Sequence, residues 1–289
     1  MSAPTVLDLF SGAAGGWSLG LHRAGLRTVA ACENDPWRAE MFRRNNPGAI
    51  MYPDVGTLTA ERIKNDLGYL PDAIFGSPPC QDASAANVNG KGLDGARTGL
   101  FFEAVRLVDE IRPRWCGFEN VPAIRTRGVD RLLAAMEAIG YAVQSFVVGA
   151  DDVGANHRRK RVWFIAFDPA QVGRVGGGPW RHWAHGDGAS HAARCDVSDA
   201  DREREPHGAV DAKVGGGESA GGDAPEPWAD WNGGPASHIR LDARVSAGLA
   251  DRRGLAGQIV AAFGDAVVPA IPELIGRAIR RVELEFGEP

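Results

Sequence analysis

The chain has 289 residues, of which 44% are hydrophobic and 24% charged, and its formal net charge is -5. This composition excludes a wholly disordered or fibrous chain. The N-terminus has neither a basic segment nor an apolar one, so we expect no secretory signal. The four cysteines (Cys32, Cys80, Cys116, Cys195) form no Cys-x-x-Cys pair, which argues against a metal site or disulfide framework and favours a reducing cytoplasm.

The negative net charge, taken alone, argues against a nucleic-acid partner, but a local basic surface can still bind phosphates. Residues 157–161 form the best candidate for such a surface, and Arg125, Arg127 and Arg131 form a second. The most apolar long stretch, residues 259–279, contains charged residues and prolines. Its periodicity fits a helix of a globular protein better than a membrane span.

Residues 1–168 alternate between short apolar runs and amphipathic stretches. In chain order, strands are predicted at 6–10, 28–32, just before Asp54, 72–75 and 115–118. Helices are predicted between them at 17–24, 36–45, 60–67, 100–111 and 129–139. Two further runs, 142–149 and 161–167, predict an antiparallel pair at one edge. Strands that alternate with helices indicate an α/β fold with a doubly wound, mostly parallel sheet.

The composition changes after Asp168, where the chain becomes rich in Gly, Asp, Ala and His and poor in large aliphatic residues. We interpret this stretch as a small irregular domain or a long insertion, with four tryptophans as its core. A helical pattern returns from Leu255. The expected parts are therefore 1–168, 169–254 and 255–289.

The loop after the first strand contains Gly12, Gly15 and Gly16. In an open parallel sheet, ligands bind beyond the carboxyl ends of the strands, and glycines let a ligand approach the backbone. The spacing differs from the Gly-x-Gly-x-x-Gly pattern of dinucleotide sites, which disfavours NAD. Glu33 and Asp54 follow the next two strands, where they suit a ribose diol and an adenine amino group. Together they favour an adenosine-containing ligand, S-adenosylmethionine (SAM) before NAD, although each feature alone also occurs in ordinary turns.

The fourth strand runs into two prolines and then Cys80. The prolines stiffen the turn and hold Cys80 at the mouth of the sheet. A free thiol has a pKa of about 8.5, so we expect a positive group or a helix N-terminus beside Cys80. Glu119 ends the neighbouring strand, where partial burial would raise its pKa and make it a proton donor.

These residues resemble the motifs of C5-cytosine DNA methyltransferases, over residues 5–167 and about 255–280. The motifs occur in the family's order: Asp8-Leu9-Phe10-Ser11-Gly12 with Gly15-Gly16, Glu33-Asn34-Asp35, Asp54-Val55, Pro78-Pro79-Cys80-Gln81, Arg97-Thr98-Gly99-Leu100-Phe101, Glu119-Asn120-Val121, His157-Arg158-Arg159-Lys160-Arg161-Val162 and Gly264-Asp265-Ala266-Val267-Val268-Pro269. One such motif would be modest evidence, whereas the ordered set is specific.

The resemblance implies a SAM-dependent, Rossmann-like methyltransferase whose residues 169–254 form the target-recognition region. A target cytosine would be flipped out of the duplex. The Cys80 thiolate would attack C6, and Glu119 would hold the N3 and N4 edge of the base. Arg161, with Arg159, would orient the O2 side. C5 would then take the methyl group, and loss of the C5 proton would release Cys80 and 5-methylcytosine.

The resemblance also assigns the binding residues. Phe10 would pack on the adenine, Glu33 would hold the ribose, and Asp54 would bind the adenine amino group. The donor set is Phe10, Gly12, Ala13, Gly15, Gly16, Glu33, Asn34, Asp54, Val55, Ser77, Pro79, Leu100, Asp265 and Ala266. The DNA set is Gln81, Ser84, His157, Arg158, Arg240 and Arg244.

The chain departs from the family pattern in three places. The first motif carries one extra residue before its glycine pair, and His157 stands where the family has glutamine. Asp265 replaces the usual asparagine, which would put a negative charge near the amino-acid end of the donor. That charge would either weaken donor binding, signal a modified donor, or serve only to cap the last helix.

Three alternatives to a DNA cytosine-5 methyltransferase stay open. They are a tRNA cytosine-5 methyltransferase, an enzyme that transfers a modified one-carbon group, and a catalytically inactive DNA-binding relative. The expected partners are double-stranded DNA and, as a candidate, a cognate restriction endonuclease. We expect a cytoplasmic, nucleoid-associated monomer with no metal and no membrane association.

Overall fold

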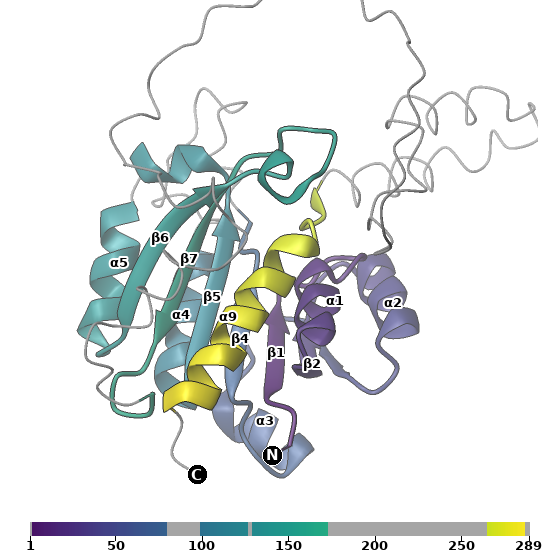
Figure 1. The fold of residues 1–289 in the computed structure, drawn as a ribbon. Coiled ribbons are helices and arrows are strands. Elements are labelled where there is room, and N and C mark those ends of the chain that lie inside the picture. The colour runs from purple at the N-terminus through teal and green to yellow at the C-terminus, as the bar shows by residue number, and fades with distance from the viewer. Residues whose placement is uncertain (1, 80–98, 127–128, 173–264, 287–289) are drawn as a thin grey trace, which may run out of the picture.

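The computed structural model describes residues 2–79, 99–126, 129–172 and 265–286. Their centre is a seven-stranded sheet with the order β3-β2-β1-β4-β5-β7-β6 (Figure 1). The strands are β1 (Thr5–Leu9), β2 (Arg27–Cys32), β3 (Ile50–Tyr52), β4 (Ala73–Gly76), β5 (Trp115–Asn120), β6 (Ala142–Val148) and β7 (Arg161–Phe167). The first five pair in parallel, whereas β7 is antiparallel to both β5 and β6. The doubly wound sheet and the antiparallel edge pair are therefore confirmed.

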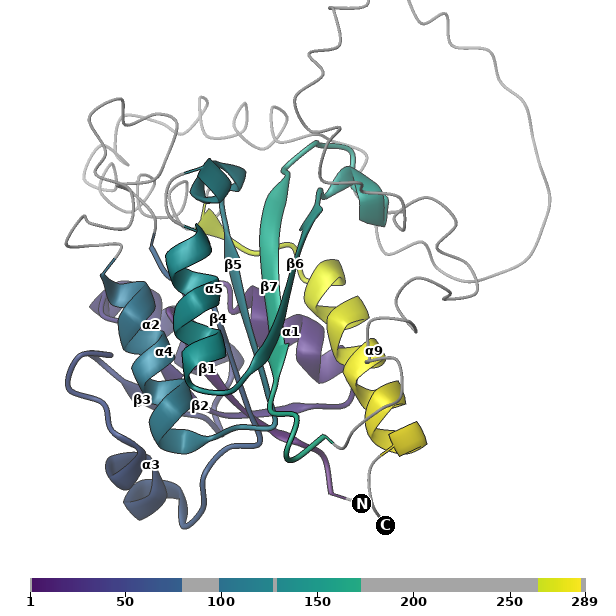
Figure 2. The ribbon, with the colours of Figure 1, turned by 90° about the vertical axis from the view of Figure 1, so that its left-hand side faces the viewer.

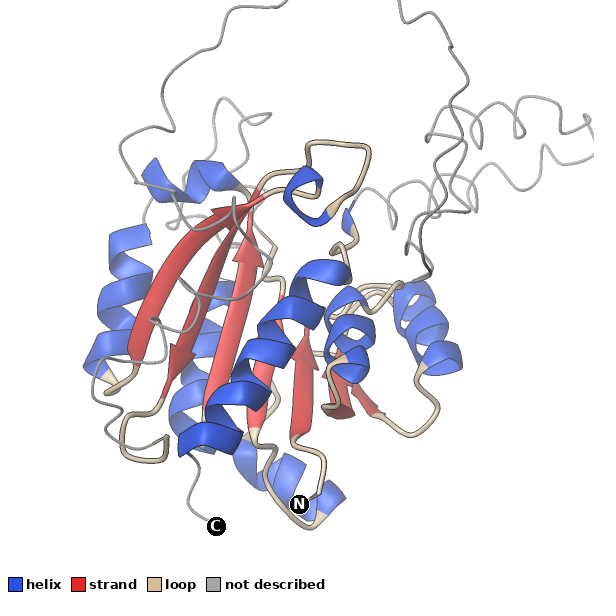
Figure 3. Cartoon of the chain, viewed as in Figure 1, coloured by secondary structure: helices blue, strands red, loops and turns tan. Residues whose placement is uncertain are grey.

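Helices cover both faces of this sheet (Figures 2 and 3). The helices are α1 (Gly16–Arg23), α2 (Pro36–Asn45), α3 (Ala60–Leu67), α4 (Leu100–Ile111), α5 (Val129–Ala138) and α9 (Ala270–Phe286), with short 3-10 helices η2 (Pro122–Thr126) and η3 (Asp151–Val153). Almost all of the expected recognition region, 169–254, lies outside the described residues, so the division into three parts stays a prediction. In the described ranges no helix is both long enough and apolar enough to cross a membrane.

Local sequence signals explain where the helices begin. Asp35 caps α2 by accepting a hydrogen bond from the backbone N–H of Arg38, and Pro36 occupies its first turn. Thr59 caps α3 in the same way, and Gly68 ends that helix in the left-handed conformation. The predicted bounds of α2, α3, α4 and β7 match the structure.

The core has two layers, one on each face of the sheet. On one face α1 and α9 bury Trp17, Leu21 and Ile275 against β-strand residues such as Trp163. On the other face α4 and α5 bury side chains that include Phe101. The last described helix therefore packs beside the first one, although they lie at opposite ends of the chain.

Glycines allow α1 to approach α9 closely. A Cβ on Gly20 would clash with the carbonyl oxygen of Pro269 and would lie 2.7 Å from the Cβ of Pro272. A Cβ on Gly16 would likewise lie 2.8 Å from the Cβ of Val267. These neighbours are backbone and rigid side-chain atoms, which cannot move aside without shifting α9.

The Gly20→Ala variant tests this contact. Alanine favours a helix over glycine by about 1 kcal/mol, but overpacking typically costs about 1–3 kcal/mol, so we expect a net loss of stability. Gly48→Ala is the matched control because a Cβ there meets no atom within 4 Å. Urea unfolding followed by circular dichroism measures both. Equal stability of the two variants would contradict the close packing.

Candidate active site

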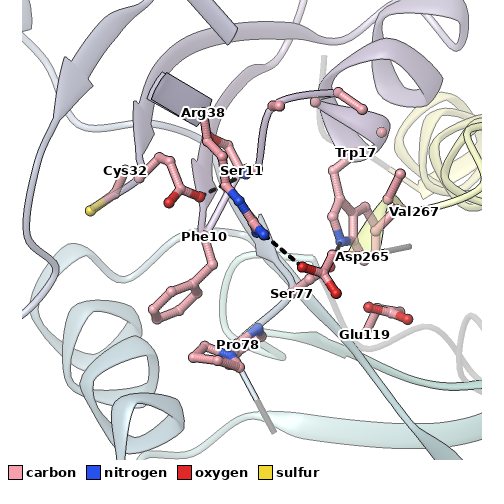
Figure 4. Close-up of a pocket in the computed structure, with 18 of the residues that line it drawn as sticks. Phe10, Ser11, Trp17, Cys32, Arg38, Ser77, Pro78, Glu119, Asp265 and Val267 are labelled. Carbon is pink, nitrogen blue, oxygen red and sulfur yellow. Dashed lines mark hydrogen bonds and ion pairs between the residues drawn. The ribbon is translucent and has the colours of Figure 1, made fainter. Parts of the chain in front are cut away.

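A cavity of about 620 Å³ lies at the carboxyl ends of the parallel strands (Figure 4). It is lined by Phe10 after β1, Glu33 after β2, Asp54 after β3, Ser77 after β4 and Glu119 near the end of β5. Doubly wound sheets hold their ligands at this edge. The sheet thus gathers, in one place, side chains that are far apart in the sequence.

Every residue that the sequence analysis assigned to the donor lines this cavity, as do Glu119, Arg159 and Arg161. His157 and Arg158 are described but do not line it. Cys80, Gln81, Ser84, Arg240 and Arg244 lie outside the described residues. The structure thus gives positions for the donor set, while the roles of these residues stay predictions.

Several lining residues were missed by the sequence reasoning. They are Ser11, Ala14, Trp17, Cys32, Asp35, Arg38, Pro78, Asn120, Val121 and Val267. Six of them (Ser11, Asp35, Pro78, Asn120, Val121 and Val267) belong to the motifs but were given no binding role, and Ala14, Trp17 and Cys32 are adjacent to motif residues. Arg38 had no such signal, since it lies within α2 and reaches the cavity only through the fold.

The turn after β1 has an unusual backbone. Phe10 has a φ of 55°, a left-handed value that is strained for a residue with a side chain, and Gly12 and Gly15 have φ values of 63° and 56°. Glu33 holds this turn, because its carboxylate accepts hydrogen bonds from the backbone N–H groups of Gly12 at 3.0 Å and Asp35 at 2.9 Å. The glycine turn and the end of β2 are thereby joined by one side chain.

This turn contains a buried hydroxyl that has no partner among the described residues. The Ser11 side-chain oxygen is buried, and it has no hydrogen-bond partner in the structure. A Cβ added to Gly12 would meet nothing within 4 Å, so the backbone there faces open space. Buried polar atoms normally have a partner, and a polar group of a ligand in this cavity would supply one.

Arg38 and Asp265 form an ion pair beside the cavity, with 2.8 Å between Nη2 and Oδ2 (Figure 4). The pair joins α2 to the segment before α9. The helix-capping role considered for Asp265 is wrong, because α9 begins only at Ala270 and the carboxylate binds Arg38 instead. The negative charge that sets this chain apart from the family pattern therefore has a cationic partner.

Glu119 is buried, with 6% of its surface exposed, and it pairs with Arg161 at 2.7 Å between Oε1 and Nε. Burial raises the pKa of Glu119, and Arg161 and a hydrogen bond from Ser77 oppose that shift. The raised pKa expected from the sequence is confirmed. Burial and the adjacent Arg161 also lower the pKa of Arg159. This cluster can exchange a proton with a bound ring and can stabilise negative charge on it.

The end of β5 is tied to the proline turn. The Asn120 side-chain amide donates to the carbonyl oxygen of Pro78 at 3.2 Å, and its own oxygen accepts from the backbone N–H of Val121 at 2.8 Å. Pro79, the residue before Cys80, lines the cavity. The turn that leads into Cys80 is thus fixed relative to Glu119.

A second buried carboxyl lies in β1, just before the glycine turn. Asp8 is 0% exposed, Ser18 Oγ donates to its Oδ2 at 2.6 Å, and Thr28 Oγ1 donates to Ser18 Oγ at 3.0 Å. The other carboxylate oxygen of Asp8 has no partner. Burial raises the pKa of Asp8 to about 7.

The family model for C-5 cytosine-specific DNA methylases matches residues 4–186, which is more than half of the chain. The chain belongs to this family. The sequence motifs and the mixed seven-stranded sheet agree with that membership.

Among curated proteins, a Type II methyltransferase of Haemophilus parahaemolyticus is 34% identical over 168 residues, covering 56% of this chain and 45% of that protein. A Type II methyltransferase of Picosynechococcus is 32% identical over 176 residues, covering 55% of this chain and 70% of that protein. A crystal structure of a prophage-encoded candidate DNA modification methyltransferase from E. coli has a TM-score of 0.50 at 33% identity, covering 58% of this chain and 47% of that chain. The chain spans about half the length of the first curated relatives that it matches.

The buried carboxyl of Asp8 makes stability depend on pH. Its pKa is about 7 in the folded state, against the ordinary 3.8, so the folded protein keeps a proton that the unfolded chain releases. This contribution is complete below about pH 4 and is lost as the pH rises to about 7, at about 1.4 kcal/mol per pKa unit, or roughly 4 kcal/mol in all.

Asp8→Asn removes this titration. We therefore expect the variant to gain stability relative to the wild type as the pH rises from about 4 to about 7. Denaturant unfolding across that range gives the two free energies of unfolding. Asp130→Asn, at an exposed position, controls for the change in net charge. A difference between Asp8→Asn and wild type that stays constant with pH would contradict the argument.

Proposed function

We propose that the chain is a DNA cytosine-5 methyltransferase that uses SAM as its methyl donor. The observation that carries this proposal is the single cavity that joins the glycine turn to Glu119, Arg161 and the proline turn before Cys80. Methyl transfer to a ring carbon needs the donor next to the nucleobase. It also needs a protein nucleophile and a proton-bearing side chain in contact with that nucleobase. The description of the matching family, a C-5 cytosine-specific DNA methylase, and that of the prophage-encoded E. coli structure, a DNA modification methyltransferase, support DNA as the substrate class.

The cavity's polar groups fit an adenosine-containing donor. Glu33 already accepts two backbone hydrogen bonds, yet a carboxylate has about four acceptor sites, which leaves capacity for a ribose diol. Phe10 is partly buried and offers a ring for the adenine, and Asp54 can accept from its amino group. The orphaned Ser11 hydroxyl can meet the amino-acid end. When bound, SAM supplies an electrophilic methyl group to this site.

The proposed mechanism begins with a flipped cytosine in the cavity. The aromatic C5 is a poor nucleophile, and addition of a thiolate at C6 converts it to an enamine-like carbon. Cys80 follows Pro79, so we assign it this step: a bond forms between its sulfur and C6, and the C5–C6 π electrons become available at C5. After C5 has taken the methyl group, loss of the C5 proton and departure of the sulfur restore the C5–C6 double bond.

Glu119 is the proposed proton donor to the cytosine ring. Its raised pKa favours a protonated carboxyl, which can donate to N3 as the thiolate adds and so neutralise the charge that moves into the ring. Arg161 holds the same carboxyl at 2.7 Å and can face O2 of the pyrimidine. Arg159 lines the cavity beside it.

DNA binding is proposed for the basic segment before β7. Arg158 and Lys160 are exposed, while Arg159 and Arg161 line the cavity. This alternation leaves two cations for backbone phosphates next to the two that face the base. The resemblance adds four candidate DNA contacts: Gln81, Ser84, Arg240 and Arg244. We also propose a cytoplasmic, monomeric enzyme, with a cognate restriction endonuclease as a candidate partner.

The Arg38–Asp265 pair bears on the nature of the donor. The idea of a modified donor came from an unbalanced charge at Asp265, and that charge is balanced by Arg38 at 2.8 Å. The ion pair therefore favours an ordinary methyl donor.

Covalent trapping tests the proposal. A duplex with 5-fluorocytosine in random sequence contexts, incubated with SAM, should form a denaturation-resistant complex with the wild type and none with Cys80→Ala, because fluorine at C5 blocks release of the sulfur. Glu119→Gln should slow methyl transfer to ordinary duplex DNA by about 10²–10⁴-fold. Trp37→Phe, in α2 and away from the cavity lining, serves as the control.

Three results would overturn the proposal or part of it. A wild-type protein that binds DNA but traps no 5-fluorocytosine would be an inactive relative. Methyl transfer to tRNA and not to DNA would change the substrate. A modified deoxynucleoside heavier than deoxycytidine by more than one CH2 group would exclude simple methylation.

A further inference from the structure

A chain of hydrogen bonds links the helix after the glycine turn to Glu119. The indole Nε1–H of Trp17 donates to the Ser77 hydroxyl at 3.1 Å. Ser77 and Glu119 both line the cavity, and hydrogen bonding from the Ser77 side chain to the carboxyl lowers the pKa of Glu119. Figure 4 shows the three residues at the same side of the cavity. Arg161 contacts the same carboxyl, so Glu119 is held by two separate donors.

The direction of this chain follows from the groups involved. An indole nitrogen can only donate, and a serine hydroxyl has one proton and two lone pairs. Because Trp17 occupies one lone pair, the hydroxyl proton of Ser77 is free to point to the ionised Glu119. When Glu119 is protonated, the second lone pair of Ser77 can accept its proton instead. Ser77 can therefore hydrogen-bond Glu119 in both protonation states of the carboxyl.

The first member of the chain is fixed in place. Trp17 is 2% exposed, and its ring stacks on Phe75 at 5.0 Å and meets Trp163 edge-on at 5.2 Å. It follows Gly16, which lies against Val267 with no room for a side chain. The position of the indole N–H is thus set by the packing of the ring against Phe75 and Trp163, and it limits where the Ser77 hydroxyl can lie.

The second member is held by the sheet. Ser77 follows β4 directly, and its backbone N–H donates to the carbonyl oxygen of Leu9 at 3.3 Å. This bond continues the pairing of β4 with β1 by one residue. A hydroxyl fixed by the strand behind it and by the indole beside it has little freedom to rotate, which is what a group that orients a carboxyl requires.

We propose that Ser77, oriented by Trp17, is a positioning residue for Glu119, and that this relay connects the catalytic carboxyl to the helix that starts at the donor side of the cavity. Its catalytic consequence rests on the proposed methyl transfer. Ser77 thus orients Glu119, whereas the sequence analysis expected it to contact the donor. Trp17 orients Ser77, a role that the sequence did not indicate.

The relay has a specific consequence for pH dependence. The Ser77 hydroxyl stabilises the ionised carboxyl, so its loss should raise the pKa of Glu119 further. If the protonated carboxyl is the active form, activity disappears as the pH rises through that pKa. Ser77→Ala should therefore turn over more slowly, because the carboxyl is less well oriented, yet should keep its activity to higher pH than the wild type.

Kinetics of four variants test the relay. We expect kcat to fall about ten-fold in Ser77→Ala and by a smaller factor in Trp17→Phe, the scale of one hydrogen bond to a charged group. The kcat of the double variant should fall no further than that of Ser77→Ala alone, since both substitutions break the same series of hydrogen bonds. Ser77→Thr keeps the hydroxyl and should restore most of the lost kcat. Ser145→Ala and Trp37→Phe, which lie outside the cavity lining, are the matched controls.

A second measurement does not depend on activity. In protein with ¹⁵N-labelled tryptophan, the Trp17 indole resonance is identified by its absence in Trp17→Phe. We expect its chemical shift to change with pH in the wild type and to lose that change in both Glu119→Gln and Ser77→Ala. A pH-dependent resonance in a protein that transfers no methyl group would leave the relay standing and refute the proposed function.

Two results would overturn the relay while leaving methyl transfer intact. One is a Trp17 indole resonance whose chemical shift changes with pH in the same way in Glu119→Gln as in the wild type. The other is a Ser77→Ala enzyme whose kcat and pH profile match the wild type, or whose loss lies wholly in donor affinity. The latter would make Ser77 a donor contact only.

Discussion

The close contact between α1 and α9 is the constraint on which the cavity depends. Three glycines make it possible, because side chains at Gly16, Gly20 or Gly276 would meet Val267, Pro269 or Ala24 at less than van der Waals distance. The contact draws the segment from Asp265 to Val267 to the cavity edge, beside the glycine turn. Without it, the part of the cavity lining formed by residues 265–267 would be missing, although every strand end would still be in place.

Two carboxylates of the cavity lining have a cationic partner from a distant segment. Glu119 is paired with Arg161, and Asp265 with Arg38. Because the members of each pair come from different elements, the charges also act as cross-links between them. Burial raises the pKa of Glu119, and the nearby Arg161 opposes that shift.

Much of this architecture could be predicted from the sequence, and the reasons are local. The helix over 36–45 could be bounded because Asp35 and Pro36 mark its start, and the edge strands 142–149 and 161–167 are apolar runs without a helix between them. The donor-side residues could be named because they follow strand ends, and parallel strands end at one edge.

The partners of these residues could not be predicted. Nothing in α2 distinguishes Arg38 from its neighbouring arginines until the fold brings Asp265 to it. Trp17 looks like an ordinary core residue at helical spacing, and its indole N–H matters only because Ser77 lies 3.1 Å away. Such contacts join residues tens or hundreds of positions apart, and they depend on packing angles that no local pattern encodes. The 3-10 helices η2 and η3 were missed for a related reason, since so few residues show no periodicity.

The reversed direction of β7 carries a mechanical consequence. A parallel strand would present its last residues to the cavity, but β7 runs the other way, so it delivers its first residue, Arg161. The backbone of Arg161 pairs with Val148 of β6, next to the β5–β7 ladder, where Glu119 lies opposite Trp163 and Asn120 opposite Val162. A slip of this ladder by a single residue would send the Arg161 side chain to the opposite surface of the sheet and unmake the pair. The register of β7 against β5 thus determines whether Glu119 is paired with Arg161.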